Sequence, residues 1–202
     1  QSPAGYPPLI HDKLKFTDVS PLNSGATLTI GTATWALPTL DFSSRTLPVT
    51  LAMGASDVYF YKDLKLSSAV TMTSTGGIAY FCGHDSKITS NGVTFNKQLA
   101  VWSTGTVKFV DNFTSNVTYS EPDAINLLKG ILDYSNVTVN TRTFSSSITP
   151  TALTGFNRTL LSNSSSVMNI TTTASSVQAF NNRTASSFSN GGYTPKIYLT
   201  GA

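Results

Sequence analysis

The chain is poor in charge and nearly free of cysteine. Charged residues make up 11 % of its 202 residues, whereas soluble domains usually carry about 25 %. The single cysteine, Cys82, excludes an internal disulfide, and we expect it to be a buried, inert thiol. The 13 basic residues form no cluster, which argues against nucleic-acid binding.

Long apolar runs are absent as well. No stretch reaches the roughly 18 apolar residues that predict a membrane-spanning helix. The chain opens on Gln1, with neither an initiator methionine nor the basic and apolar regions of a signal peptide. We therefore expect a mature extracellular protein from which a signal peptide has been removed.

Hydroxyl and carboxamide side chains replace the missing charge. The sequence holds 30 Thr, 27 Ser and 14 Asn. Branched Cβ atoms favour strands over helices, so the composition indicates an all-β protein. A hydroxyl surface also keeps its character in strong acid, where carboxylates lose their charge near their reference pKa values of about 4.

Sites for N-linked glycans crowd into the later part of the chain. Seven N-x-[ST] sequons lie within residues 112–184, and none precedes them. Such a triplet accepts a glycan only on the surface of a secreted protein. We expect a sugar-coated surface there, although a Ser/Thr-rich chain also produces sequons by accident. The predicted sites are Asn112, Asn116, Asn136, Asn157, Asn163, Asn169 and Asn182.

Short apolar alternations separated by turn residues predict the fold. No internal repeat is apparent, and helical periodicity is nearly absent, so we predict an immunoglobulin-like or pilin-like β-sandwich. The expected strands cover residues 26–37, 47–52, 58–61, 69–73, 78–82, 93–101, 105–110, 117–119, 137–144, 167–172, 177–180 and 193–199.

One short helix is predicted within this sandwich, over residues 120–132. Ser120 and Asp123 resemble a capping box, and Gly130 offers a stop. Its apolar face would hold Ile125, Leu128 and Leu132.

The first 20 residues differ from the rest. Residues 1–8 hold three prolines and a glycine, which suits an extended leader. Residues 9–16 then alternate like an amphipathic strand. We therefore divide the chain into a leader and donor strand, residues 1–20, and a single sandwich domain, residues 21–202. The residues expected to fill a groove in another subunit are Leu9, Ile10, Leu14 and Phe16.

Signals for catalysis or metal binding are weak. His84, Asp85 and Ser86 are consecutive, and neighbouring side chains on an extended chain point to opposite faces, so they predict a polar turn and no triad. Cys82 and His84 lack a second pair of metal ligands. We expect no enzymatic activity, no metal and no cofactor beyond covalent glycans. Trp35 and Trp102 suit core packing or a sugar-stacking platform, and a Lys–Asn isopeptide crosslink stays open.

The Gln1 start, the N-terminal donor segment, the Thr/Ser/Asn-rich body and the late sequons resemble archaeal threads, the glycosylated extracellular filaments of thermoacidophilic Sulfolobales. The resemblance implies pilin-like sandwiches, joined head to tail by donor strands and N-glycosylated. An archaeal bundling pilin and bacterial biofilm fibres are similar but poorer matches.

The predicted function is that of a structural subunit in a cell-surface filament, a homopolymer that serves adhesion or biofilm formation. Its strand exchange would be open-ended, because the contact between subunits is heterologous. The alternative is a monomeric surface adhesin or carbohydrate-binding sandwich, which Trp35 or Trp102 would serve. A third interpretation is an S-layer or virion coat component.

Overall fold

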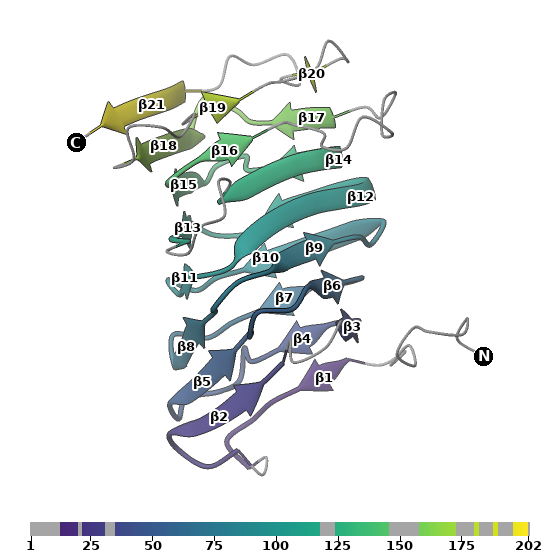
Figure 1. The fold of residues 1–202 in the computed structure, drawn as a ribbon, viewed down its shortest axis with the longest axis vertical. Helices are drawn as coiled ribbons and strands as arrows, with labels where there is room; N and C mark the ends of the chain where they lie inside the picture. Colours follow the sequence, from purple (N-terminus) through teal and green to yellow (C-terminus); the bar gives the residue numbers. More distant parts are fainter. Residues whose placement is uncertain are drawn as a thin grey trace.

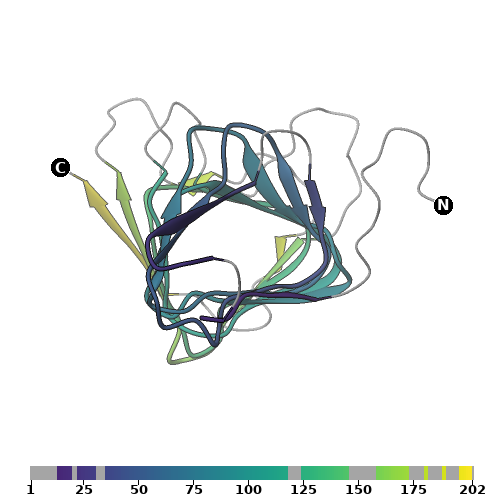
Figure 2. The same ribbon diagram turned by 90° about the horizontal axis from the view of Figure 1, so that it is seen from below.

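A computed structural model shows a parallel β-solenoid, in which the chain winds upward from its N-terminal turns (Figure 1). Seen along its length, the strands surround a common interior (Figure 2). The structure describes residues 13–19, 22–30, 35–117, 124–145, 158–172, 180–181, 188–189 and 196–201. Within these residues it contains strands and no helix.

The strands form three faces, which we name by the side chains that they carry outward. The charged face contains β1 (Leu14–Lys15), β4 (Leu40–Asp41), β7 (Leu64–Lys65), β10 (Asp85–Thr89), the later parts of β12 (Gln98–Phe109) and β14 (Ile125–Asp133), β17 (Arg158–Leu161) and β20 (Phe188–Ser189). The polar face contains β2 (Ala26–Thr29), β5 (Val49–Ala52), β8 (Val70–Thr73), β11 (Thr94–Phe95), β13 (Phe113–Ser115), β15 (Thr138–Thr141), β18 (Val167–Thr172) and β21 (Lys196–Gly201). The aromatic face contains β3 (Trp35–Leu37), β6 (Val58–Phe60), β9 (Ile78–Phe81), the first parts of β12 and β14, β16 (Phe144–Ser145) and β19 (Phe180–Asn181).

Each turn of the solenoid places similar residues above one another. On the charged face Leu14 pairs with Leu40, Leu40 with Leu64, and Leu64 with Ile88, all in parallel register. These steps are 26, 24 and 24 residues long. The repeat therefore exists, but its length varies and only the kind of residue recurs.

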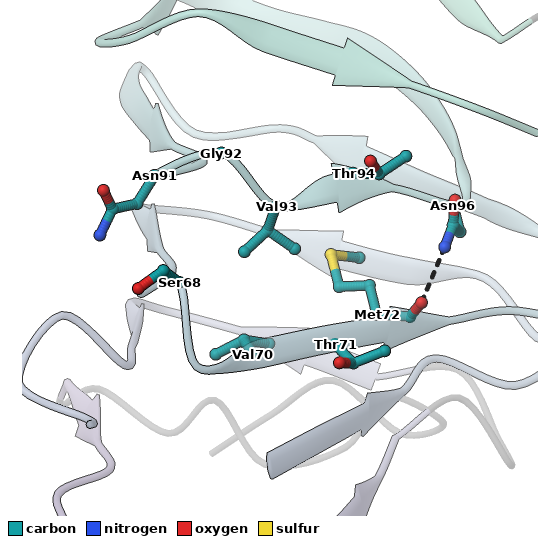
Figure 3. A pocket seen from close by; sticks show the side chains of 9 residues that line it. All are labelled: Ser68, Val70, Thr71, Met72, Asn91, Gly92, Val93, Thr94 and Asn96. Carbon is teal, nitrogen blue, oxygen red and sulfur yellow. Dashed lines mark hydrogen bonds between the residues drawn. The ribbon is translucent and has the colours of Figure 1, made fainter. Parts of the chain in front are cut away.

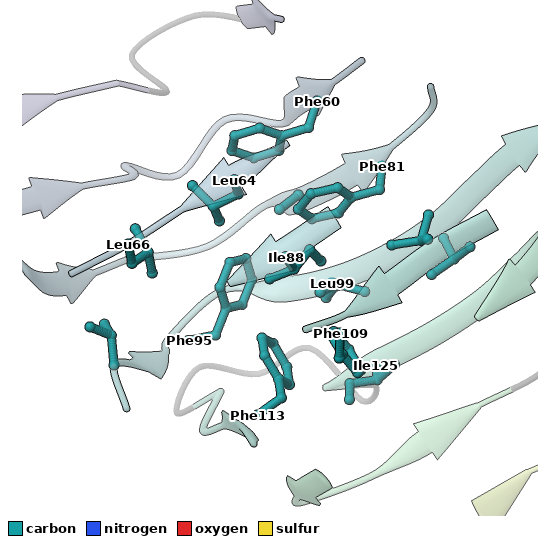
Figure 4. Close-up of a cluster of buried hydrophobic side chains, with 14 of the residues drawn as sticks. Phe60, Leu64, Leu66, Phe81, Ile88, Phe95, Leu99, Phe109, Phe113 and Ile125 are labelled. Atoms are coloured by element: carbon teal, nitrogen blue, oxygen red, sulfur yellow. The ribbon is translucent and has the colours of Figure 1, made fainter. Parts of the chain in front are cut away.

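Stacked apolar side chains fill the interior (Figure 4). Phe60 and Phe81 stack with ring centroids 4.8 Å apart, and Phe109 and Phe113 stack at 4.1 Å. All four are fully buried. At about 25 cal/mol per Å² of buried apolar surface, this column of rings and aliphatic chains is the main stabilising contribution to the fold.

Glycines allow the tight corner between the aromatic and charged faces. A Cβ on Gly83 would lie 2.0 Å from the Tyr61 carbonyl oxygen, and a Cβ on Gly105 would lie 1.8 Å from that of His84. Gly130 has φ +91° and would bring a Cβ within 2.6 Å of the Ser103 oxygen. No other residue fits these approaches without a backbone shift.

The predicted β-sandwich is wrong, because every strand pair is parallel and the pairs stack successive turns. Apolar alternation shows which side of a strand is buried, and it does so equally for a sandwich and a solenoid. The direction of the neighbouring strand leaves no mark in that pattern.

The predicted helix is also wrong where the structure describes it. Ile125–Asp133 forms strand β14, with Ile125, Leu127 and Leu132 buried. The strand turns a corner at Gly130, which shifts the alternation by one residue. That shift produced the helix-like spacing of Ile125, Leu128 and Leu132.

Candidate functional site

Outward side chains are sorted by face. The polar face presents neither charged nor aromatic side chains at its outward positions within 26–171 that the structure describes. The outward residues there are Thr27, Thr29, Thr50, Ala52, Thr71, Thr73, Thr94, Asn96, Thr114, Asn116, Thr138, Asn140, Val167, Asn169 and Thr171. The charged face, by contrast, carries lysines at Lys15, Lys65, Lys87 and Lys108.

Acidic residues act as clamps between and within turns. Each of the seven that the structure describes accepts a backbone N–H: Asp18 from Thr46 and Leu47, Asp41 from Ser43, Asp57 from Ile78, Asp63 from Lys87, Asp85 from Thr106, Asp111 from Ser90 and Asn91, and Asp133 from Ser135. Carboxylates used in this way satisfy donors at the corners. They are structural, and they do not converge on a reaction centre.

An aromatic strip, formed by Tyr59, Tyr80 and Trp102, follows the aromatic face. Tyr59 and Tyr80 are register partners whose rings stack at 4.9 Å and 11°. Trp102 lies against Tyr80 at 6.0 Å, tilted by 60°. Its side chain is 37 % exposed, so the strip ends in an indole that solvent can reach.

Polar groups surround the exposed indole. Lys129 is the register partner of Trp102 on the next turn. Two residues beyond the indole, the Thr104 hydroxyl lies 3.3 Å from His84 Nδ1. Tyr61, on the neighbouring corner, is 39 % exposed. The arrangement joins one apolar ring to several hydrogen-bonding groups on a rigid backbone.

Two hollows lie on the polar face. One, of about 420 Å³, separates β8 from β11, and Asn96 Nδ2 bridges it by donating to the Met72 carbonyl at 2.8 Å (Figure 3). The other, of about 620 Å³, has hydroxyl, carboxamide and guanidinium groups in its wall. The latter is lined by Thr94, Thr114, Ser115, Asn116, Asn140, Thr141, Arg142 and Thr171.

Lys97 is a fully buried cation held by backbone oxygens. Its Nζ donates to the carbonyls of Met53, Gly54 and Gly76 at 3.1, 3.2 and 2.5 Å. Burial lowers the pKa of Lys97 to about 8, against an opposing effect of Asp57. These carbonyls belong to two lower turns, so Lys97 fastens three turns at one corner. The contacts describe a hydrogen-bonding role, whereas an isopeptide crosslink stays untested.

The consecutive His84, Asp85 and Ser86 do not form a triad. Ser86 is buried at 1 % exposure, while the side chains of His84 and Asp85 are 76 % and 70 % exposed. Cys82 is partly buried, and burial raises the pKa of its thiol to about 11. Among the described residues, no three His, Cys, Asp or Glu side chains gather as metal ligands. The absence of an enzyme activity stays a prediction.

The sequons fall into two groups. Asn112, Asn116 and Asn136 are exposed. Asn163 and Asn169 are half-buried, and their Nδ2 atoms donate to Asn136 and Asn140 Oδ1 at 2.8 Å. These last two therefore take part in ladders between turns, which occupy the nitrogen that a glycan would modify. Asn157 and Asn182 lie outside the described residues, and glycosylation itself stays a prediction.

The described part of the predicted donor strand pairs within its own chain. Leu14 N donates to the Thr39 carbonyl at 2.9 Å, and Phe16 stacks on Phe42 at 4.6 Å. Leu9 and Ile10 lie outside the described residues. The boundary expected at residue 20 falls inside the first turn, since β1 pairs with β4.

Sequence reasoning singled out Trp102 but missed Tyr59 and Tyr80, which lie 21 residues apart. Aligning the chain at the solenoid repeat would have placed them in one column. Trp35 begins β3. Among the described residues, no helix is long and apolar enough to cross a membrane. No family model, curated protein or solved structure matches the chain.

Proposed function

We propose that the chain is a non-catalytic surface adhesin module that binds carbohydrate through Trp102 and the aromatic strip. The observation that carries this proposal is the exposed indole, placed against Tyr80 and beside Lys129, Thr104 and His84. The C–H faces of a sugar ring pack on an indole, while its hydroxyls require donors and acceptors nearby. Exposed Trp and Tyr also dominate binding energy at many interfaces.

The fold supports the same proposal. A solenoid repeats its surface from turn to turn, so it presents several binding groups at fixed spacings to a polymeric ligand. Its backbone is already ordered, which lowers the entropic cost of binding. The donor-strand filament receives less support, because Leu14 and Phe16 are used inside their own chain.

A glycan array followed by titration tests the proposal. Trp102→Ala should weaken binding of the captured glycan by about 1–2 kcal/mol, or roughly tenfold in Kd, with an unchanged melting temperature. Trp102→Phe should retain part of the affinity. Val110→Ala serves as the control, because it truncates a side chain of similar exposure, 48 %, beyond the strip. Equal glycan binding by Trp102→Ala and the parent would refute the proposal.

A further inference from the structure

The polar face carries a column of five threonines. Thr27 pairs with Thr50, and Thr50 pairs with Thr71. Above the hollow, Thr94 pairs with Thr114. Five successive turns thus present threonine at the same outward position, beside a second column made of Thr29, Ala52, Thr73, Asn96 and Asn116.

Strand propensity alone does not explain this column. Lysine, aspartate and tyrosine occupy outward positions on the other two faces, for example Lys87, Asp85 and Tyr80. The polar face uses none of them at its described outward positions within 26–171. Its buried partners, Leu51 and Met72, fix the strands from inside.

The column has a regular spacing in two directions. Neighbouring strands lie about 4.8 Å apart, and alternate residues of a strand lie about 6.6 Å apart. Threonine has few rotamers because its Cβ is branched. Hydroxyls and methyls therefore repeat at fixed positions on a surface without charges, which would otherwise orient water around themselves.

We propose that this threonine face, Thr27, Thr29, Thr50, Thr71, Thr73, Thr94 and Thr114, binds ice. The prism faces of hexagonal ice repeat their water oxygens over distances of the same size in the two directions. Threonine hydroxyls can donate to and accept from such a lattice, while the methyl groups favour water that is already ordered over their liquid hydration shell. This site is separate from the aromatic strip, and neither proposal depends on the other.

The sequons support the placement of the binding surface. Within the described residues, sequons on the polar face begin at Asn116. The first four threonines of the column, from Thr27 to Thr94, lie on turns that carry none. Glycans on the later turns would leave this part of the face uncovered.

Ice adsorption of the fluorescently labelled full chain, with inhibition of ice recrystallisation, tests the proposal. The parent should enter a slowly growing ice hemisphere and keep ice crystals small. Thr71→Tyr should lose most of this adsorption, because the ring breaks the plane, and Thr71→Val should lose less. Thr89→Tyr is the matched control, since Thr89 is a half-buried outward threonine on the charged face.

Circular dichroism must show the same thermal unfolding for all variants that are compared. Should Thr71→Tyr fail to fold, Thr50→Lys provides the second disruption of the same column. Exclusion of the parent from ice would overturn the proposal, as would equal adsorption by Thr71→Tyr and Thr89→Tyr. Binding to crystalline polysaccharide particles without binding to ice would also overturn it, and would assign the face to a glycan.

Discussion

Asp41 shows how a chain with little charge uses the charge it has. It is 1 % exposed and accepts bonds from Ser43 N and Oγ at 2.8 and 2.6 Å, and from Lys13. Burial by itself would raise the pKa of Asp41, but the bonds from Lys13 and Ser43 outweigh it and lower the pKa to about 2. A carboxylate of this kind remains charged in moderate acid.

The pH dependence of stability follows from that pKa. Since the folded pKa lies below the model value of 3.8, the contribution of Asp41 is complete above pH about 4 and disappears as the pH falls through about 2. Chemical unfolding at a series of pH values should show Asp41→Asn to be less stable than the parent by about 2 kcal/mol at neutral pH. The difference should vanish below pH about 2.

Asp85→Asn is a suitable control for this series, because the Asp85 side chain is 70 % exposed. A constant difference between parent and Asp41→Asn from neutral pH down to pH about 1 would show that ionisation of Asp41 does not stabilise the fold.

Among the elements, the first strand distinguishes most clearly between solenoid and donor-strand filament. Leu14 packs against the core of its own chain, so Leu14→Asp should lower the free energy of unfolding by about 2 kcal/mol. Lys15→Ser, on the exposed side of the same strand, should have little effect. Thermal unfolding measures both. Unchanged stability of Leu14→Asp with loss of polymerisation would instead favour donor-strand exchange.

At the scale of the whole molecule, the sequence predicted strands better than their arrangement. Val49–Ala52, Val58–Phe60, Val70–Thr73 and Ile78–Phe81 all lie within predicted strands. Local alternation suffices for this, because it depends on residues two apart. Their stacking depends on residues 21–26 apart, such as Tyr59 with Tyr80 or Leu14 with Leu40.

The candidate site was predictable only in part for the same reason. Trp102 could be singled out as a lone aromatic residue in an alternating run. The strip that it completes, and the column from Thr27 to Thr114, become visible only when turns of unequal length are aligned. Gly105 and Gly130 adjust that length at the corners, which conceals the repeat from inspection of the linear sequence.

The most direct test of the account is disulfide trapping in a Cys82→Ser background. In the solenoid Thr50 pairs with Thr71 and Ala52 pairs with Thr73, both in parallel register. Neighbouring parallel strands lie about 4.8 Å apart, within the Cα separation that a disulfide bridges. Mass spectrometry of the oxidised monomers should therefore find a bridge in each double-cysteine variant, Thr50→Cys with Thr71→Cys and Ala52→Cys with Thr73→Cys. A bridge between Ala52→Cys and Ala69→Cys, with none between Ala52→Cys and Thr73→Cys, would reveal antiparallel pairing and contradict the solenoid.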